Sequence, residues 1–485
     1  MTGRIRSGPG RVLHEEVLAP QFASEAAGNL PWYVLIEKVL LLEYVRMGVL
    51  SAEEAGRVAA ALAGVTPEVL AADPETNMSD LAFALERLVT ARLTVPVPQW
   101  HVDRSRNDLQ ACAHLMAARA ELLESAAALL QCARAAHALA GRHTTSPMPG
   151  YTHLQAAQVM TPGLHFSALS AALVHTLGRL LATYDGIDLS PLGAGAMTGQ
   201  ELPFDRARMA KLLGFAAAQP HPLVAVASRA WQLEIAAELS MLGLTLSRFV
   251  TDLMTWGGSE HGFIDLPDEL SAISSAMPQK KNFPILERIR GRAAVLTGGY
   301  LDIALIQRAT PFANSVEVAK EGGGQLCGLW RTARSVLRLL TAVLENLTCR
   351  ERRMKAACEE AYLGAFSLAN LLTLRQGVPW RTAQVIVGEY VVAAPPPSRP
   401  DPALLNRVGA RHGHPVRMAK DLLVEAFDPE RDLARKSLPS TVRRLLAQQE
   451  AELKRLSRQW DRRGATALGA ADRIEEELRA CRTTT

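Results

Sequence analysis

The sequence predicts an all-α protein whose core is a bundle of long helices. Apolar residues make up 48% of the 485 residues and aromatic residues only 5%, with Ala and Leu dominating, which favours helices. Alternation of β-branched and polar residues over several positions is almost absent, so few strands are expected. Apolar residues instead recur at helical spacing over two long stretches, 107–143 and 230–256.

Each of these stretches predicts one long helix with a wide apolar face. In the first, Leu115, Leu122 and Leu129 recur at seven-residue spacing, and a second apolar row runs beside them. The second stretch repeats the pattern and ends at a glycine pair beginning with Gly257, a natural helix stop. Faces this wide pack against several neighbours, which indicates a bundle.

The chain divides into three segments. Prolines and a polar patch precede the first long helix, and a proline-rich run at 394–402 interrupts the last quarter of the chain. We therefore expect an N-terminal domain at 1–103, a central helical-bundle domain at 104–353 and a C-terminal domain at 354–485 that closes with a charged helix.

The net charge and the cysteine content indicate which kind of partner and which cellular compartment to expect. The 53 Lys and Arg residues against 49 Asp and Glu leave a net charge of +4, too small to argue for nucleic-acid or membrane binding. Six widely spaced cysteines indicate reduced thiols in a cytoplasmic protein, with no zinc site. The N-terminus lacks a signal-peptide core, and polar residues interrupt the most apolar stretch, 164–182, which falls short of the ~20 apolar residues of a membrane span. A small molecule is the expected partner.

The polar segment 101–108, HVDRSRND, opens the first long helix. Free backbone N–H groups and the helix dipole at such an N-terminus favour an anion, so this segment is a candidate cradle for a carboxylate. An alternative stays equally open, in which Ser105, Asn107 or Asp108 caps the helix and the arginines lie in solvent.

The segment 148–158, MPGYTHLQAAQ, places polar side chains in an apolar stretch just after a turn. Thr152, His153 and Gln155 would need hydrogen-bond partners if they were buried. A lone histidine there is more often a hydrogen-bonded core residue than a catalyst, unless a carboxylate elsewhere in the chain orients it. Glu287 is the candidate for that carboxylate.

The segment 257–287 is a stretch of about thirty residues with weak periodicity, and connections that long inside a compact body are usually functional. Its polar side chains are two hydroxyls, two ammonium groups and an amide: Ser274, Ser275, Lys280, Lys281 and Asn282. A disordered polar loop is the alternative, and the interspersed Ile273, Met277 and Phe283 fit that alternative poorly.

Taken in order, these segments resemble the fumarase/aspartase superfamily, and SRND, MPGYTHLQ and SSAMPQKKN are most similar to the argininosuccinate lyase family. The stretch 190–215, with SPLGAGA and LPFDR, resembles it too, so the resemblance runs from about residue 12 to about residue 460. It implies a three-domain, all-α fold with a long central bundle that forms the core of a homotetramer.

The resemblance implies a lyase that uses neither a metal nor an organic cofactor. Such enzymes remove a proton beside a carboxylate and cleave a C–N or C–O bond by anti elimination, releasing fumarate with an amine or water. Charge builds up on the carboxylate, so fixed cations and hydrogen-bond donors must face it, and Lys280 and Asn282 would supply them. Ser274 would be the general base, its alkoxide stabilised by lysines and helix N-termini.

Further roles follow from the same resemblance. His153 would lie near the leaving group, and Glu287 would orient it. The remaining matched positions would bind the substrate and neutralise its carboxylates. These positions are Ser105, Arg106, Asn107, Thr152 and Gln155, with Arg229 and Lys320 in weaker alignment. Each site would be shared between three subunits of the homotetramer.

The chain departs from the family pattern where the family recognises the amino-acid end of argininosuccinate. Ala82 and Leu85 replace polar residues, Phe312 replaces a tyrosine, and Ser367 stands in place of an aspartate. A buried polar group left unpaired costs roughly 1–3 kcal/mol, so such a site would bind arginine poorly. We therefore expect a lyase acting on an N-substituted aspartate, a succinyl-amine, whose amine is less polar or differently shaped than arginine.

The loop of the third segment departs as well. Ile273 stands where the family usually has a glycine. Phe283 stands where the family usually has a proline, and the proline follows one residue later as Pro284, so the backbone restraint that a proline imposes on the residue before it moves by one position. Asp103 replaces another usual glycine. Two alternatives remain: a genuine argininosuccinate lyase of arginine biosynthesis, or a non-catalytic, crystallin-like structural homologue. Retention of the catalytic set argues against the second alternative.

Overall fold

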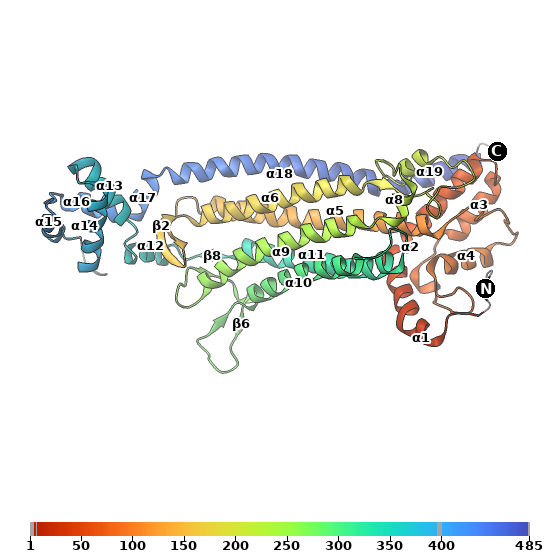
Figure 1. The fold of residues 1–485 in the computed structure, drawn as a ribbon, viewed down its shortest axis with the longest axis horizontal. Helices are drawn as coiled ribbons and strands as arrows, with labels where there is room; N and C mark the ends of the chain where they lie inside the picture. The colour runs from red at the N-terminus through yellow and green to blue at the C-terminus, as the bar shows by residue number, and fades with distance from the viewer. Residues whose placement is uncertain (1–3, 6, 395–399, 484–485) are drawn as a thin grey trace.

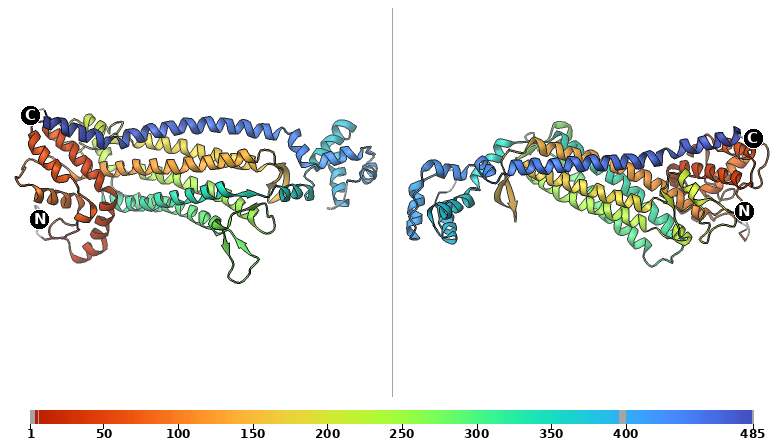
Figure 2. Two further views of the ribbon diagram at one scale, coloured as in Figure 1. Left: turned by 180° about the vertical axis from the view of Figure 1, so that it is seen from behind. Right: turned by 90° about the horizontal axis from the view of Figure 1, so that it is seen from above.

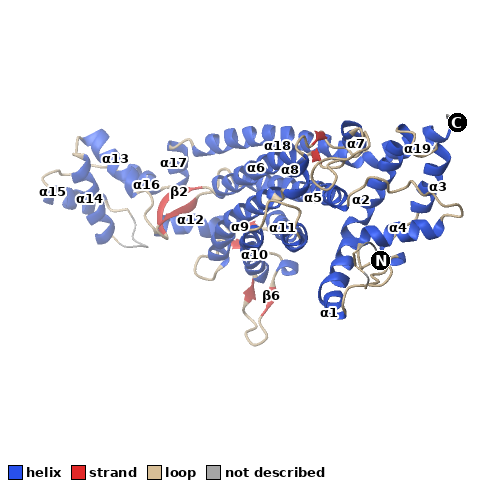
Figure 3. Ribbon diagram, turned by 45° about the vertical axis from the view of Figure 1, so that its right-hand side comes forward, coloured by secondary structure: helices blue, strands red, loops and turns tan. Residues whose placement is uncertain are grey.

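The computed structural model describes residues 4–5, 7–394 and 400–483, and it is built almost entirely from helices (Figure 1). Its strands are short and pair only in two-stranded sheets, as the colouring by secondary structure makes plain (Figure 3). The predicted all-α fold class is therefore confirmed.

Long helices run side by side through the middle of the molecule and share one continuous apolar core. They are α5 (Arg106–Arg142), α6 (Pro162–Ile187), α9 (Ala230–Gly257), α10 (Pro284–Gln307), α11 (Gly322–Asn346) and α18 (Leu438–Leu468). The tightest pairs are α9 with α10 and α5 with α6, and α18 lies along α5 and α6 for most of their length (Figure 2).

The apolar stripe predicted for the first long helix faces the core. Leu122 and Leu129 of α5 are 0% exposed and Leu115 is 9% exposed, because the helix packs against α6, α11 and α18 at once. The second predicted helix also ends as expected, since α9 stops at Gly257 with Gly258 as its C-cap.

One end of the bundle is covered by the N-terminal helices. These are α1 (Arg11–Leu13), the π-helix η1 (His14–Leu18), α2 (Ala19–Arg46), α3 (Ala52–Leu62), the 3-10 helix η2 (Pro67–Val69) and α4 (Leu81–Arg92). Ser51 starts α3 with a capping box and Asp80 caps α4. The last helix, α19 (Ala470–Thr483), returns to pack against α2 and α3, so both ends of the described chain lie here (Figure 1).

The opposite end carries a hairpin, a strand pair and a small helical unit. The elements are β1 (Met148–Thr152), β2 (Gln155–Met160), β5 (Ile264–Asp265), β8 (Thr348–Cys349), α12 (Glu351–Glu360), α13 (Ala365–Gln376), α14 (Trp380–Ala393), α15 (Pro402–Arg411), α16 (Lys420–Phe427) and α17 (Pro429–Arg435). β1 pairs with β2 and β5 with β8, both antiparallel. Helices α13 to α16 enclose a second apolar core, separate from that of the bundle.

Short elements connect the long helices. They are β3 (Leu189–Ser190), α7 (Arg206–Leu212), β4 (Ala217–Ala218), α8 (Pro222–Ala227), η3 (Asp268–Leu270), β6 (Ala272–Ile273), β7 (Lys281–Asn282) and the π-helix η4 (Glu317–Glu321). β3 and β4 pair in parallel, whereas β6 and β7 form an antiparallel hairpin that projects away from the bundle (Figure 1).

The predicted C-terminal segment, 354–485, is spread over all three regions of the molecule. Its first part forms the small helical unit, but α18 belongs to the bundle and α19 to the N-terminal end. We propose that the third domain ends near residue 437, where α18 begins, with 1–103 and 104–353 kept as the first two domains. Residues 395–399 of the proline-rich run lie outside the described residues.

Helix α6 is long and apolar enough to cross a membrane by length and composition alone, which the sequence interpretation did not allow. In the structure, however, 61% of its most apolar window is buried, because the helix packs against α5, α9 and α18. Burial of this kind is the pattern of a core helix.

Candidate active site

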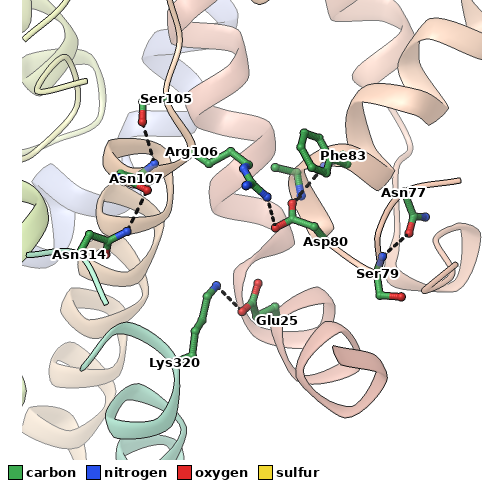
Figure 4. Close-up of polar contacts among 11 residues, drawn as sticks. Glu25, Asn77, Ser79, Asp80, Phe83, Ser105, Arg106, Asn107, Asn314 and Lys320 are labelled. Carbon is green, nitrogen blue, oxygen red and sulfur yellow. Dashed lines mark hydrogen bonds and ion pairs between the residues drawn. The ribbon is translucent and has the colours of Figure 1, made fainter. Parts of the chain in front are cut away.

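The N-terminus of α5 presents the first polar segment in an ordered arrangement (Figure 4). Ser105 is the N-cap, and its Oγ accepts a hydrogen bond from the backbone N–H of Asn107 at 3.1 Å. The capping alternative is thus correct for Ser105. It is wrong for Arg104, which forms a buried ion pair with Glu37, whereas Arg106 pairs with Asp80 and stays half exposed.

Arg106 is held in place by two groups from the N-terminal helices. Its Nη1 lies 2.9 Å from Oδ2 of Asp80, and its guanidinium carbon lies 4.4 Å from the centre of the Phe83 ring. About half of the Arg106 side chain stays exposed (51%). The guanidinium is therefore oriented by a carboxylate and an aromatic face and still has donors available for a substrate carboxylate.

A chain of amides links Asn107 to Arg229. Nδ2 of Asn314 donates to Oδ1 of Asn107 at 2.9 Å, and Nη2 of Arg229 donates to Oδ1 of Asn314 at 3.3 Å. Asn107 also donates to the carbonyl of Ala196 at 3.3 Å. These contacts fix the Asn107 amide from both sides.

Arg229 itself is only 3% exposed, so it does not reach open solvent. Its Nη1 donates to the carbonyls of Val226 and Ser228, at 2.8 and 3.0 Å. Burial lowers the pKa of Arg229 to about 10. In this chain Arg229 contacts Asn314 and backbone, so it bears on the site through Asn107.

Lys320 lies in the π-helix η4, next to the start of α11, and pairs with Glu25 of α2 at 2.5 Å (Figure 4). Both side chains are mostly buried, at 12% and 11% exposed. Single π-turns within helical runs are frequent at functional sites because they turn side chains out of the regular register. We call Ser105, Arg106, Asn107, Arg229, Asn314 and Lys320 the α5 cluster.

Asp108 fastens a neighbouring loop to the same helix end. Its Oδ2 accepts hydrogen bonds from the backbone N–H groups of Gly193 and Gly195, at 2.9 and 3.1 Å. Burial raises the pKa of Asp108 to about 6, against the lowering effect of those donors. The loop that supplies the Ala196 carbonyl to Asn107 is therefore held by the next residue of α5.

Asp103 has a left-handed backbone, with φ of 53°, which explains why a glycine is usual at this position. An aspartate tolerates this conformation better than most residues. Its Oδ2 accepts a hydrogen bond from the backbone N–H of Leu202 at 2.7 Å, so the side chain adds a contact that a glycine lacks.

The second polar segment forms the β1–β2 hairpin at the opposite end of the bundle. Its turn residues, His153 and Leu154, both have positive φ values, 53° and 61°, as a two-residue type I′ turn requires. The side chains of Thr152, His153 and Gln155 are exposed, so the idea of buried polar groups needing internal partners is wrong for this segment. Leu154 is 89% exposed beside them.

The third polar segment ends in the β6–β7 hairpin, whose tip is residues 274–280. Oγ of Ser274 accepts hydrogen bonds from the backbone N–H groups of Ala276 and Met277, at 3.4 and 3.0 Å. Lys280 closes the tip on the other strand, directly before Lys281. Two amide donors and a nearby lysine favour negative charge on the Ser274 oxygen.

The two lysines of this hairpin have different surroundings. Lys281 bonds back to the base of its own loop, through Asp268 at 3.1 Å, Asp265 at 3.3 Å and the carbonyl of Leu266 at 2.5 Å. Both lysines are exposed, but Lys280 stands at the tip. Lys281 therefore secures the hairpin through its ion pairs with Asp265 and Asp268.

Asn282 is the last residue of β7, and Glu287 is exposed in the first turn of α10. Within the described part of the chain, no hydrogen bond or ion pair joins Glu287 to His153. The α5 cluster, the β1–β2 turn and the hairpin tip emerge from different parts of the molecule (Figure 1). A single chain therefore brings together Ser105, Arg106, Asn107, Arg229 and Lys320, but neither the tip nor His153 with them.

The sequence analysis did not identify three residues in or next to the α5 cluster. Glu25 and Asp80 are the counter-ions of Lys320 and Arg106, and Asn314 bridges Asn107 and Arg229. They come from three distant stretches of chain, and no local pattern marks them. Two residues expected to change recognition of the amine lie in different surroundings. Leu85 is 2% exposed in the main core, whereas Phe312 is 62% exposed.

Acidic, histidine and cysteine side chains do not gather in threes that could hold a metal ion anywhere in the described ranges. All six cysteines are free thiols. The chemistry that the three polar regions support is acid–base chemistry on an anionic substrate, with hydroxyl, imidazole, ammonium and guanidinium groups.

Comparisons with known proteins give the family. A model of a lyase family matches residues 59–298. Argininosuccinate lyase of Desulforamulus reducens is 34% identical over 348 residues, covering 71% of this chain and 75% of that protein. Argininosuccinate lyase 1 of Shouchella clausii is 29% identical over 93% of each chain. Among solved structures, EDDS lyase in complex with formate has a TM-score of 0.83 at 24% identity, over 99% of this chain and 98% of that one.

Proposed function

The chain belongs to the argininosuccinate lyase-like branch of the fumarase/aspartase superfamily and is a fumarate-releasing carbon–nitrogen lyase, and we propose that it acts on an N-substituted aspartate with an amine other than arginine. The substrate would be a succinyl-amine, split to fumarate and the amine, or formed from them in reverse.

One observation carries this proposal: Ser274 stands at an exposed hairpin tip with its oxygen accepting two backbone N–H groups. A serine hydroxyl is a poor base, and its alkoxide becomes accessible only when fixed donors and cations stabilise it. Ser274 would take the proton from the carbon beside the substrate carboxylate. Lys280 and Asn282, from the other strand, would stabilise the charge that develops on that carboxylate.

The remaining groups would bind the substrate and assist departure of the amine. Arg106, with its free donors, and Lys320 would neutralise the carboxylates, while Asn107 and Ser105 would orient them. Arg229 would act through Asn314 and Asn107. At the β1–β2 turn, Thr152 and Gln155 would contact the substrate, and His153, oriented by Glu287, would hold or pass the proton for the leaving nitrogen.

We propose further that the working enzyme is a homotetramer in which three chains complete each site. Support comes from the separation of the three polar regions within one chain. Support also comes from apolar side chains that are exposed on two helices of the bundle, because large exposed apolar patches mark interaction surfaces. These are Met241 and Leu244 of α9 and Val295, Leu301 and Leu305 of α10, from 43% to 63% exposed.

Two alternatives compete with the proposal of an amine other than arginine. A genuine argininosuccinate lyase would cleave argininosuccinate as well as any relative. A crystallin-like structural homologue would not turn over any substrate.

We also propose a cytoplasmic location, since six free thiols suit a reducing compartment.

The test is to incubate the purified protein with fumarate and a set of amines and to follow the loss of fumarate absorbance, with argininosuccinate cleavage as the reference reaction. We expect addition of at least one amine at a higher kcat/KM than that for argininosuccinate. Equal or better efficiency on argininosuccinate would instead favour the genuine argininosuccinate lyase, and inactivity with every substrate would favour the structural homologue.

A further inference from the structure

A cavity of about 600 Å³ opens beside the α5 cluster, between α2, α5, α9 and α11. Lys320 and Glu25 both line it, so the cavity begins where the cluster ends. Its volume lies in the range of about 300–1,000 Å³ that is typical of small-molecule sites. A substrate whose carboxylate meets Lys320 would extend naturally into this space.

Helix α5 turns one polar face toward the cavity. His114 comes seven residues after Asn107 and Glu121 seven residues after His114, so the three share a face of the helix. Burial, together with the positive charges of Lys320 and Arg229, lowers the pKa of His114 well below its usual value. The imidazole is therefore neutral near pH 7 and can both donate and accept a hydrogen bond.

Gln232 of α9 offers the cavity an unused donor. Its side chain is 1% exposed, and its Oε1 accepts from Gln307 at 2.8 Å, but its Nε2 has no hydrogen-bond partner in the part of the chain that the structure describes. A Cβ at Gly323 would stand 3.3 Å from this nitrogen, so the glycine leaves it open. A buried amide left unpaired costs roughly 1–3 kcal/mol, which an acceptor on a ligand would recover.

Two charged pairs line the cavity near His114 and Gln232, whereas the other charged lining residues, Glu16, Glu321 and Arg331, are exposed. Lys320 pairs with Glu25, and Arg334 of α11 pairs with Glu121. A charged group placed beside His114 and Gln232 would compete with these two pairs, and breaking a partly buried pair leaves an uncompensated charge. An uncharged polar end would meet His114 and the Gln232 amide without that cost.

We infer that this cavity receives the amine part of the substrate and selects amines whose far end is an uncharged hydrogen-bonding group, such as a hydroxyl or an amide. His114 and Gln232 are the residues that determine this specificity. The inference rests on the proposed lyase function and names the class of its leaving group.

The experiment measures fumarate consumption with five amines of similar length: an alkylamine, a hydroxyl-ended amine, an amide-ended amine, a diamine and arginine. The unmodified protein should prefer the hydroxyl- and amide-ended amines. In His114→Leu and Gln232→Leu, the KM for those two amines should rise about tenfold, while the KM for fumarate and the kinetics with the alkylamine stay the same. His114→Gln, which keeps a neutral hydrogen-bonding group, should restore most of the preference.

A matched control is His175→Leu, because His175 is an exposed histidine of α6 that does not line the cavity. Unaltered amine preference in both cavity variants would overturn the inference and leave the lyase function standing. An equal loss with all five amines would also overturn it, since it would mark a structural role. Inactivity of the unmodified protein with the whole set and with argininosuccinate would remove the lyase function and the inference together.

Discussion

Polar side chains have different surroundings in the α5 cluster and at the two exposed turns, the β1–β2 turn and the tip of the β6–β7 hairpin. In the cluster, Arg106, Asn107 and Lys320 each already have a side-chain partner within the chain. At the β1–β2 turn and the hairpin tip, His153 and Lys280 are exposed. The side chains of the α5 cluster are thus oriented within the chain, whereas His153 and Lys280 are left exposed. This difference is expected if, as proposed, other subunits complete the site.

The largest effect should come from the hairpin tip. Ser274→Ala removes the proposed base, and general-base roles are typically worth about 10²- to 10⁴-fold, so kcat should fall by that factor or more. The melting temperature and the oligomeric state should not change, because Ser274 bonds only within its own tip. Ser275→Ala, at the exposed neighbouring hydroxyl, is the control and should stay active. A Ser274→Ala variant with normal kcat would exclude this residue from the chemistry.

Mixing two inactive variants tests whether one active site takes Ser274 and His153 from different chains. Ser274→Ala and His153→Asn should each be inactive, and asparagine suits the left-handed backbone at residue 153. If subunits exchange and sites are shared, about a quarter of sites in a 1:1 mixture should regain both groups by random assembly. The measurement is kcat before and after exchange in mild denaturant. Each variant exchanged with itself is the control, and no recovery despite proven exchange would count against shared sites.

A smaller effect is expected inside the cluster. Asn314→Ala removes the bridge between Asn107 and Arg229, so Asn107 should lose orientation, and the KM for the dicarboxylate should rise about tenfold with less change in kcat. Asn346→Ala is a matched control, since that side chain bonds only to the carbonyl of Ala342 in its own helix. An equal rise of KM in both variants would show that the bridge has no special role.

The smallest effect concerns pH and Asp108. Its pKa is raised from 3.8 to about 6 in the folded state, so folding favours the protonated form. The stability that this group contributes is present below about pH 4 and is lost as pH rises through 6, by roughly 3 kcal/mol in total. As the pH rises from 4 to 6, the melting temperature of the unmodified protein should therefore fall by a few degrees relative to that of Asp108→Asn. A difference independent of pH would contradict the raised pKa.

The sequence was most informative where signals are local. Heptad spacing predicted α5, the glycine pair predicted the end of α9, and the three polar segments were all identified as candidate regions. The burial of the β1–β2 turn was mispredicted, because the chain reverses at His153 and Leu154 and leaves residues 152–155 exposed, although Met148 and Val159 at the base of the hairpin are buried. The return of α18 along the bundle could not be predicted either, since helical spacing tells which face is apolar but not what covers it.

By itself, the sequence determined the fold class, the long helices and the order of the polar motifs, because these depend on residue spacing along the chain. Only the tertiary structure decided that Lys320 meets Glu25, that Asn314 joins Asn107 to Arg229, and that a cavity lies beside them. Such contacts join residues distant in sequence, and hydrogen bonds and ion pairs form only over a few ångströms, so they exist only once the helices have packed.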